Sequence, residues 1–315
     1  MAKYLVTGGA GFIGSHIVTA LVERGDSVRV FDNLSTGRRA NLDHVCGKFD
    51  FVEGDLVNRR EVEKALDGIE VVFHQAALAS VPRSVAQPLD TNAVCVTGTV
   101  NVLDVARLAG VRRVVYAGSS SIYGDRTAAA AKHETDLPAP VSPYAAAKAA
   151  GELYCQAFHA TYGLETVTVR YFNVFGPRQD PKGEYAAVIP IFATKMLSGE
   201  RPTIYGDGRQ SRDFTYIANV VAGNLLAAEA PNAPGQTFNI ACGEQMNLLD
   251  LVAAINNVLN TDLQPIFEPP RVGDVRDSLA DISSARKVLG YEPAVAFENG
   301  LRRSIEYYRQ LATIK

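Results

Sequence analysis

Cysteine is scarce in this sequence, and its few copies are scattered. The 315 residues include four cysteines and five histidines, with no CxxC pair and no grouping of the two types; the cysteines are Cys46, Cys95, Cys155 and Cys242. Zinc sites and disulfide frameworks both need such residues at close, regular spacings. We therefore expect no metal site, and a reducing compartment in which the thiols stay free.

Long apolar runs and an excess of one charge are also lacking. No uninterrupted apolar stretch approaches the ~20 residues of a membrane helix, and the opening MAKYLVTGGAGFIG breaks into glycines too early for a signal peptide. With 31 basic and 34 acidic side chains, the net charge is -3, so no basic field attracts nucleic acid or an anionic membrane. We expect a cytoplasmic protein with neither partner, in which any anionic ligand is held locally.

The first half of the chain alternates short β-branched runs with longer amphipathic stretches. With 47% hydrophobic residues, the chain is able to bury a large core. The rhythm is typical of an α/β fold, a Rossmann-type doubly wound parallel sheet. The predicted strands are Tyr4–Thr7, Ser27–Asp32, Asp50–Glu53, Val71–His74, Val111–Ala117 and Glu165–Arg170.

After Arg170 the pattern changes to loops rich in Gly, Pro and Tyr, with helices predicted over Val188–Leu197, Leu248–Leu259 and Asn299–Arg309. We interpret this part as a smaller mixed α/β substrate-binding domain. A further helix-then-strand pattern, ending in QTFNI, indicates a return to the first domain before residue 241. The expected division is therefore 1–171 plus about 214–241 for the cofactor, and about 172–213 plus 242–315 for the substrate.

The sequence TGGAGFIG places Gly8, Gly11 and Gly14 between a predicted strand and a predicted helix. Glycines there permit a tight turn and leave backbone amides at the helix N-terminus to face a pyrophosphate. Asp32 ends the second predicted strand, 21 residues beyond Gly11, where a carboxylate is able to hydrogen-bond an adenosine ribose. A dinucleotide site is favoured over a simple packing turn followed by a surface acid.

The acid also bears on the identity of the dinucleotide. Asp32 would repel a 2′-phosphate, so NAD is favoured, although Arg38 and Arg39 nearby keep NADP open. Asp55 is interpreted either as an adenine-side residue, together with Leu56, or as an ordinary helix N-cap. His74 ends the fourth predicted strand, and we expect backbone groups to satisfy it.

Tyr144 and Lys148 stand four residues apart in a predicted helix, so their side chains share a face. Lowering the pKa of a phenol from ~10 to about 7 takes roughly 4 kcal/mol, which an ammonium and a cationic nicotinamide together supply. The serine run ending at Ser121 follows a predicted strand, where doubly wound folds bind their ligands. Alone, the Tyr-Lys spacing would indicate a solvated pair; with the glycine turn, it indicates a general base.

Motifs throughout the chain resemble the extended short-chain dehydrogenase/reductases, and among them the nucleotide-sugar 4-epimerases, most closely the bacterial UDP-N-acetylglucosamine 4-epimerases. The similar stretches include TGGAGFIGSH, DNLSTG, HQAALASVPRS, SSSIYGD, SPYAAAK, NVFGPRQDP, IYGDGRQSRDFTYI and GDVRDSLADIS. The resemblance implies NAD as cofactor and a UDP-sugar as substrate.

The resemblance also assigns roles to individual residues. The implied catalytic residues are Ser119, Tyr144 and Lys148. Besides Tyr144 and Lys148, the implied cofactor contacts are Gly8, Gly11, Phe12, Ile13, Gly14, Asp32, Asn33, Asp55, Leu56, Gln75, Ala76, Ala77 and Asn92. The implied substrate contacts are Ser119, Ser121, Asn173, Val188, Tyr205, Arg212, Arg271, Asp274 and Ser278. Arg212 and Arg271 suit a diphosphate, with a structural salt bridge as the alternative for each.

The implied reaction is epimerisation at C4 of a UDP-hexose. Tyr144 removes the proton of the 4-hydroxyl while C4 delivers hydride to NAD, and hydride returns to the other face of the 4-keto sugar. Related 4,6-dehydratases and UDP-glucuronate decarboxylases carry acids where this chain has Ser120 and Ser121, which favours simple return. UDP-glucuronate 4-epimerisation stays open, as does a non-catalytic NAD-binding sensor, which the intact Ser119, Tyr144 and Lys148 disfavour.

Two finer expectations follow from the resemblance. Ser278 occupies the position of a gate beside the sugar, where a small residue admits N-acetyl groups, so N-acetylated UDP-hexoses are expected substrates. The helices predicted near Leu89–Leu108 and Ala145–Tyr162 carry surplus apolar residues, which suits a homodimer built on a four-helix interface.

Overall fold

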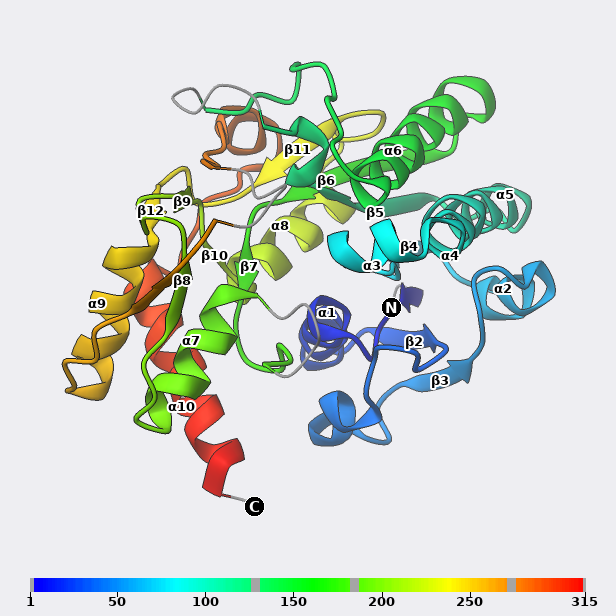
Figure 1. Cartoon of the computed structure of the whole chain (residues 1–315). Coiled ribbons are helices and arrows are strands. Elements are labelled where there is room, and N and C mark those ends of the chain that lie inside the picture. The colour runs from blue at the N-terminus through cyan, green and yellow to red at the C-terminus, as the bar shows by residue number, and fades with distance from the viewer. Residues whose placement is uncertain (1–2, 126–130, 182–186, 271–275, 314–315) are drawn as a thin grey trace.

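A seven-stranded parallel sheet forms the centre of the molecule (Figure 1). The computed structural model describes residues 3–125, 131–181, 187–270 and 276–313. The strand order is β11-β6-β5-β4-β1-β2-β3, and every neighbouring pair runs parallel. The strands are β1 (Lys3–Thr7), β2 (Ser27–Asp32), β3 (Asp50–Glu53), β4 (Val71–His74), β5 (Arg113–Ser119), β6 (Glu165–Tyr171) and β11 (Thr237–Ile240).

Helices cover both faces of the sheet, because alternate strand residues point to opposite sides. Tyr4 and Val6 pack into one core with helices α1 (Phe12–Glu23) and α8 (Ile217–Glu229), while Leu5 packs into a second. The second core also contains helices α2 (Arg59–Leu66), α5 (Gly98–Leu108) and α6 (Pro143–Tyr162). Burial on both faces explains the continuous apolar runs of the sequence.

All six predicted strands are present, and the predicted doubly wound α/β class is confirmed. One strand is shifted: β5 begins at Arg113 rather than Val111 and continues to Ser119. The amide of Val111 closes the end of α5 by donating to the Ala106 carbonyl, so Val111 belongs to the turn. The QTFNI segment forms β11, which pairs with β6, so the chain returns to the main sheet after a long excursion.

The excursion and the C-terminal part lie together beside the sheet (Figure 1). The predicted helices are found as α7 (Val188–Leu197) and α9 (Leu248–Leu259), and the third is longer, α10 (Phe297–Thr313). Three two-stranded ladders join them, β7 (Val174–Phe175) with β10 (Thr215–Tyr216), β9 (Ser211–Arg212) with β12 (Met246–Asn247), and β8 (Thr203–Tyr205) with β13 (Ile266–Glu268).

Short helical segments complete the described chain. They are α3 (Val81–Ala86), α4 (Pro88–Asn92), the 3-10 helices η1 (Arg39–Val45) and η3 (Ser120–Tyr123), and the π-helical turns η2 (Ala93–Thr97) and η4 (Ala285–Leu289). Among the described residues, no helix is both long enough and apolar enough to cross a bilayer.

A buried arginine fastens the loop after β7 to α1. The Arg178 guanidinium donates to the Ser15 carbonyl at 3.0 Å, to Thr19 Oγ1 at 3.1 Å and to His16 Nδ1 at 3.2 Å. The other ring nitrogen of His16, Nε2, donates to the Pro177 carbonyl at 2.9 Å. Because Nδ1 accepts from Arg178, it carries no proton, and the ring is neutral. Burial and Arg178 lower the pKa of His16 to about 3, so this seam is built for the neutral form.

Candidate active site

The glycine turn opens α1 directly after β1, as predicted. Gly8 has a φ of +66°, and a Cβ on it would lie 2.7 Å from the backbone of Ala76. A Cβ on Gly14 would lie 2.2 Å from the Gly8 carbonyl oxygen. A Cβ on Gly11 would meet only the Gly8 oxygen, at 3.1 Å, and Gly11 lines a cavity, so its missing side chain leaves space for a ligand.

That cavity has a volume of about 230 Å³ and gathers most of the residues predicted to bind the cofactor. The predicted residues on its wall are Gly8, Gly11, Phe12, Ile13, Gly14, Asp32, Asn33, Asp55, Leu56, Gln75, Ala76 and Ala77. Asn92 is elsewhere, exposed at the end of α4, and Val94 lines the wall instead. The helical turns between α4 and α5 set which residue faces the cavity, and spacing alone did not reveal it.

The acid at the end of β2 is fixed by the backbone. Asp32 Oδ2 accepts from the Ala10 amide at 3.0 Å and Oδ1 from the Leu34 amide at 2.8 Å, while burial raises its pKa. Arg38 pairs with Asp180, and Arg39 pairs with Glu53 at 3.1 Å. Since both arginines already neutralise carboxylates, the site fits the ribose hydroxyls of NAD better than a 2′-phosphate.

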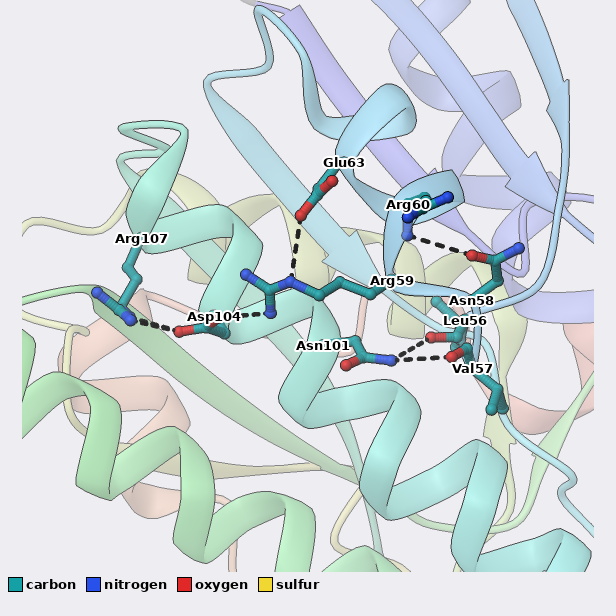
Figure 2. Close-up of polar contacts among 9 residues, drawn as sticks. All are labelled: Leu56, Val57, Asn58, Arg59, Arg60, Glu63, Asn101, Asp104 and Arg107. Carbon is teal, nitrogen blue, oxygen red and sulfur yellow. Dashed lines mark hydrogen bonds and ion pairs between the residues drawn. The ribbon is translucent and has the colours of Figure 1, made fainter.

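The loop carrying Asp55 and Leu56 is held from two helices (Figure 2). Asn58, and not Asp55, caps α2, because its side chain accepts from the Arg60 amide at 3.2 Å. From α5, Asn101 donates to the carbonyls of Leu56 at 2.9 Å and Val57 at 3.3 Å. The sequence interpretation did not include Asn101; its only signal is a polar residue within an apolar helix.

Ion pairs reinforce the same junction. Arg59 of α2 binds Asp104 of α5 at 2.6 Å and Glu63 at 3.1 Å, and Arg107 binds Asp104 at 2.5 Å (Figure 2). All four side chains are partly exposed, so water and salt screen each pair and its contribution to stability is small. Their effect is to set the orientation of α2 against α5, and with it the cavity wall between them.

The predicted catalytic residues meet at the end of β5. Ser142 caps α6 by accepting from the Ala145 amide at 3.2 Å, and Pro143 opens the helix, which places Tyr144 in its first turn. Ser119 lies close enough to the Tyr144 phenol to lower its pKa, and the Ser119 hydroxyl lies 2.8 Å from that of Ser121. The structure therefore brings both predicted serines to the phenol.

Lys148 lies one turn further along α6 and is buried. Its ammonium donates to the Ala117 carbonyl at 2.8 Å and stands 5.0 Å from the centre of the Tyr116 ring. Burial lowers the pKa of Lys148 and raises that of Tyr144, against the opposing hydrogen bond from Ser119. The protein alone therefore keeps the phenol neutral, and its acidification stays a prediction for the cofactor-bound state.

Of two neighbouring residues, His74 differs from expectation, and Cys95 is a small core residue. His74 is satisfied by side chains and not by backbone, since its ring nitrogens lie 2.8 Å from Thr7 Oγ1 and 3.0 Å from Thr99 Oγ1. Burial lowers the pKa of His74 to about 3. Cys95 is buried and packs in a small apolar cluster, which joins the cofactor cavity to α6.

A second cavity, of about 340 Å³, lies among the later elements. Asn173, Val188, Tyr205 and Arg212 line it, as predicted, together with apolar walls from Phe192 and Leu248 that the sequence interpretation did not identify. Ser278 lies 3.4 Å from Asn173 Nδ2 and accepts its hydrogen bond. The predicted Arg271 and Asp274 lie outside the described residues.

The catalytic residues stand between the two cavities because of the strand order. Ser119 ends β5, which lies between β4 and β6 in the sheet. Gln75 and the three residues after it follow β4 and line the first cavity, while Asn173 follows β6 and lines the second. Carboxyl ends of parallel strands share one edge, so Ser119 lies at the same edge as both loops, while Ser119, Tyr144 and Lys148 are on neither cavity wall.

This is the arrangement of the short-chain dehydrogenase/reductases. Comparison places the chain more narrowly: residues 4–241 match the NAD dependent epimerase/dehydratase family, to which the chain belongs. A UDP-glucose 4-epimerase of Mycolicibacterium smegmatis is 42% identical over 317 residues, covering 98% of each chain.

Two solved structures extend the similarity. A UDP-N-acetylglucosamine 4-epimerase of Methanobrevibacter ruminantium, in complex with UDP-N-acetylmuramic acid, is 41% identical with a TM-score of 0.94, covering 98% of this chain and 99% of that one. A UDP-glucose 4-epimerase of Thermus thermophilus, in complex with NAD, is 38% identical with a TM-score of 0.89 and the same coverage.

Replacing Gly14 with alanine is expected to weaken cofactor binding. The new Cβ would collide with the Gly8 carbonyl, which cannot move without opening the turn. We expect NAD affinity, measured by calorimetry, to fall by about ten-fold or more, because the turn presents the amides that hold the pyrophosphate. Gly25→Asn, in open space after α1 at a φ of +85°, is the control and should bind NAD normally. Unchanged affinity in Gly14→Ala would contradict the assignment.

Proposed function

We propose that this chain is a UDP-sugar 4-epimerase that inverts C4 of a UDP-hexose through a transient 4-keto sugar, with NAD as its cofactor. The observation that carries the proposal is the meeting of Ser119, at the end of β5, with Tyr144, in the first turn of α6, at the sheet edge whose neighbouring loops line the two cavities. The first cavity fits a dinucleotide, and the second offers Arg212 and Asn173 to a nucleotide sugar. The similarity to 4-epimerases over 98% of the chain supports the same conclusion.

The two ligands divide the chain between them. We assign residues 1–171 with about 214–241 to the cofactor, and about 172–213 with 242–315 to the nucleotide sugar. Support comes from the cavities, because every predicted residue on the first wall precedes residue 78, and the predicted residues on the second wall lie between 173 and 212.

Each catalytic side chain has a task set by its position. When bound, NAD supplies a hydride acceptor for C4 and a positive charge near the phenol. Tyr144 takes the proton of the 4-hydroxyl and later returns it, Ser119 donates to the phenolate, and Lys148 stabilises it electrostatically. Ser120 and Ser121 offer no acid for an elimination, so return of hydride to the opposite face of the sugar completes the reaction.

Tyr144→Phe is expected to lower kcat by about 10²–10⁴-fold, the range for loss of a general base. The products from UDP-glucose, UDP-N-acetylglucosamine and UDP-glucuronate are separated by chromatography to resolve the C4 epimers. NAD binding should persist, since Tyr144 is absent from the wall of the first cavity. Tyr154→Phe, exposed on the same helix, is the matched control and should keep full activity. Near-normal turnover by Tyr144→Phe on all three sugars would refute the proposal.

The sugar accepted is proposed to include N-acetylated hexoses. Ser278 contacts Asn173 on the wall of the second cavity, and its side chain is small. A serine there leaves room beside the sugar that a bulkier residue would fill. The 41% identity to a UDP-N-acetylglucosamine 4-epimerase supports the same preference.

Ser278→Tyr is expected to remove turnover of UDP-N-acetylglucosamine while turnover of UDP-glucose persists. The tyrosine ring would occupy the volume that the N-acetyl group needs, and UDP-glucose has a hydroxyl in its place. Steady-state kinetics on both substrates provide an internal control for folding. Equal losses on the two sugars would count against Ser278 as the gate.

We further propose that the protein is a homodimer. Large apolar side chains stand exposed on packed helices, with Val85 of α3 65% exposed, Leu89 of α4 82% and Leu153 of α6 60%. A second copy related by a two-fold axis would cover this surface with its own equivalent.

Leu89→Glu combined with Leu153→Glu is expected to convert the dimer to a monomer. Two carboxylates per chain would have to lose water inside the interface, which is unfavourable. Sedimentation equilibrium measures the mass, with Phe267→Glu, exposed on β13, as the control. A dimer that persists in the double variant would place the interface elsewhere.

A further inference from the structure

A buried arginine stands at the junction of the catalytic elements. Arg170 of β6 has a side chain that is 3% exposed, and Nε and Nη2 donate to the Glu152 carboxylate at 3.0 and 2.5 Å. Its Nη1 donates to the Tyr123 hydroxyl at 2.6 Å. That hydroxyl in turn donates to Asn239 Oδ1 on β11 at 2.7 Å. The guanidinium thus holds side chains from two elements directly, α6 and η3, and Tyr123 links it to a third, β11.

The first arm of this arrangement leads to Ser119. Tyr123 is the last residue of η3, and Ser121 lies in the same turn. The Ser121 amide donates to Ser119 Oγ at 3.2 Å, and the two hydroxyls are 2.8 Å apart. Because η3 spans only four residues, a shift of Tyr123 moves Ser121 and so reorients the Ser119 hydroxyl.

The second arm leads to the phenol. Glu152 lies on α6, four residues after Lys148 and eight after Tyr144, which is one face of the helix. Thr237 of β11 also donates to Glu152 Oε1, at 3.3 Å. The Arg170–Glu152 pair therefore sets the rotation of α6 about its axis, and with it the direction of the phenol.

We propose that Arg170 is a positioning residue for catalysis, which holds Ser119 through Tyr123 and Tyr144 through Glu152 so that the two hydroxyls meet. The inference rests on the proposed 4-epimerase function. Arg170 touches neither cavity, so it acts only through these partners. Small displacements of reacting groups are costly to rate, with about 1 Å worth roughly 100-fold.

The test needs a change that leaves the buried charges paired. Removing Arg170 or Glu152 would strand the partner's charge in the core and threaten folding. Tyr123→Phe instead deletes one oxygen, breaks the link to η3 and leaves the Arg170–Glu152 pair intact. Tyr291→Phe is the matched control, because Tyr291 is fully buried and its hydroxyl donates at 2.9 Å to the Ala241 carbonyl, just after β11, and not to Arg170, η3 or α6.

Steady-state kinetics on UDP-hexoses should separate the two variants. We expect kcat of Tyr123→Phe to fall by about ten-fold or more with KM unchanged, a loss in the range of misplaced catalytic groups. The acid limb of the kcat/KM profile should move to higher pH, because the Tyr144 phenolate loses its donor Ser119. The titratable groups beside Tyr144, namely Cys95, Tyr116 and Lys148, are the same in both variants. Tyr291→Phe should keep both the rate and the profile.

Equal kcat values and pH profiles in the two variants would overturn the inference. If the wild-type protein converts no UDP-hexose, the proposed function fails. The positioning role of Arg170 is then tested by a measurement that does not depend on turnover. NMR of tyrosine labelled with ¹³C at Cζ follows the titration of Tyr144 in the NAD-bound protein, with Tyr144→Phe to assign the signal. A Tyr144 titration shifted to higher pH only in Tyr123→Phe supports positioning, and an unshifted one refutes it.

Discussion

The contact between the Lys148 ammonium and the Ala117 carbonyl orders the centre of this protein. A buried cation is costly unless its protons are satisfied, and here a strand carbonyl at 2.8 Å and the Tyr116 ring provide for it. The need to satisfy this ammonium fixes the position of α6 along β5, because Lys148 has to reach the Ala117 carbonyl. Gly151 lets the helix approach, since a Cβ there would lie 2.2 Å from the Tyr116 hydroxyl.

From this contact, the position of the phenol follows. Tyr144 lies one helical turn before Lys148, so a helix held at Ala117 brings the phenol to Ser119, two residues further along the same strand. In the strand order, β5 lies between β4 and β6. The pair therefore lies between the loop after β4, which lines the first cavity, and the loop after β6, which lines the second. Packing of one helix on one strand thus selects which residues do chemistry.

The sheet could be predicted from the sequence because its strands are buried on both faces. Such strands are continuous apolar runs, and the glycine turn, the Asp32 strand end and the Ser142–Pro143 helix start are local signals. The cofactor residues predicted in the glycine turn and at the end of β2 accordingly lie on the first cavity wall, although Phe31, Ser35 and Thr36 nearby were not predicted. Asn92 shows the limit, because the helical turns after it decide the facing residue, and a linear spacing does not encode that rotation.

Contacts between distant segments could not be predicted in this way. The contacts of His74, of Asn101 with the Leu56 loop and of Arg170 with its partners join residues 18 or more positions apart. In the bare sequence each of these residues is only one polar side chain among many. Such pairs form only after the strand order is set. Sequence patterns therefore identify the predicted catalytic residues better than the residues that position them.

The seam between Arg178 and His16 carries a consequence for acid tolerance. His16 has a folded pKa of about 3, far below the ordinary value of 6.5, so its share of stability is complete above pH 6.5 and is lost as the pH falls from there toward 3. A proton on the imidazole would set a second cation against the guanidinium and break the bond to Arg178. Mild acidity thus lowers the free energy of unfolding while the folded seam stays bonded, and the β7 loop loses its hold on α1 only as the pH approaches 3.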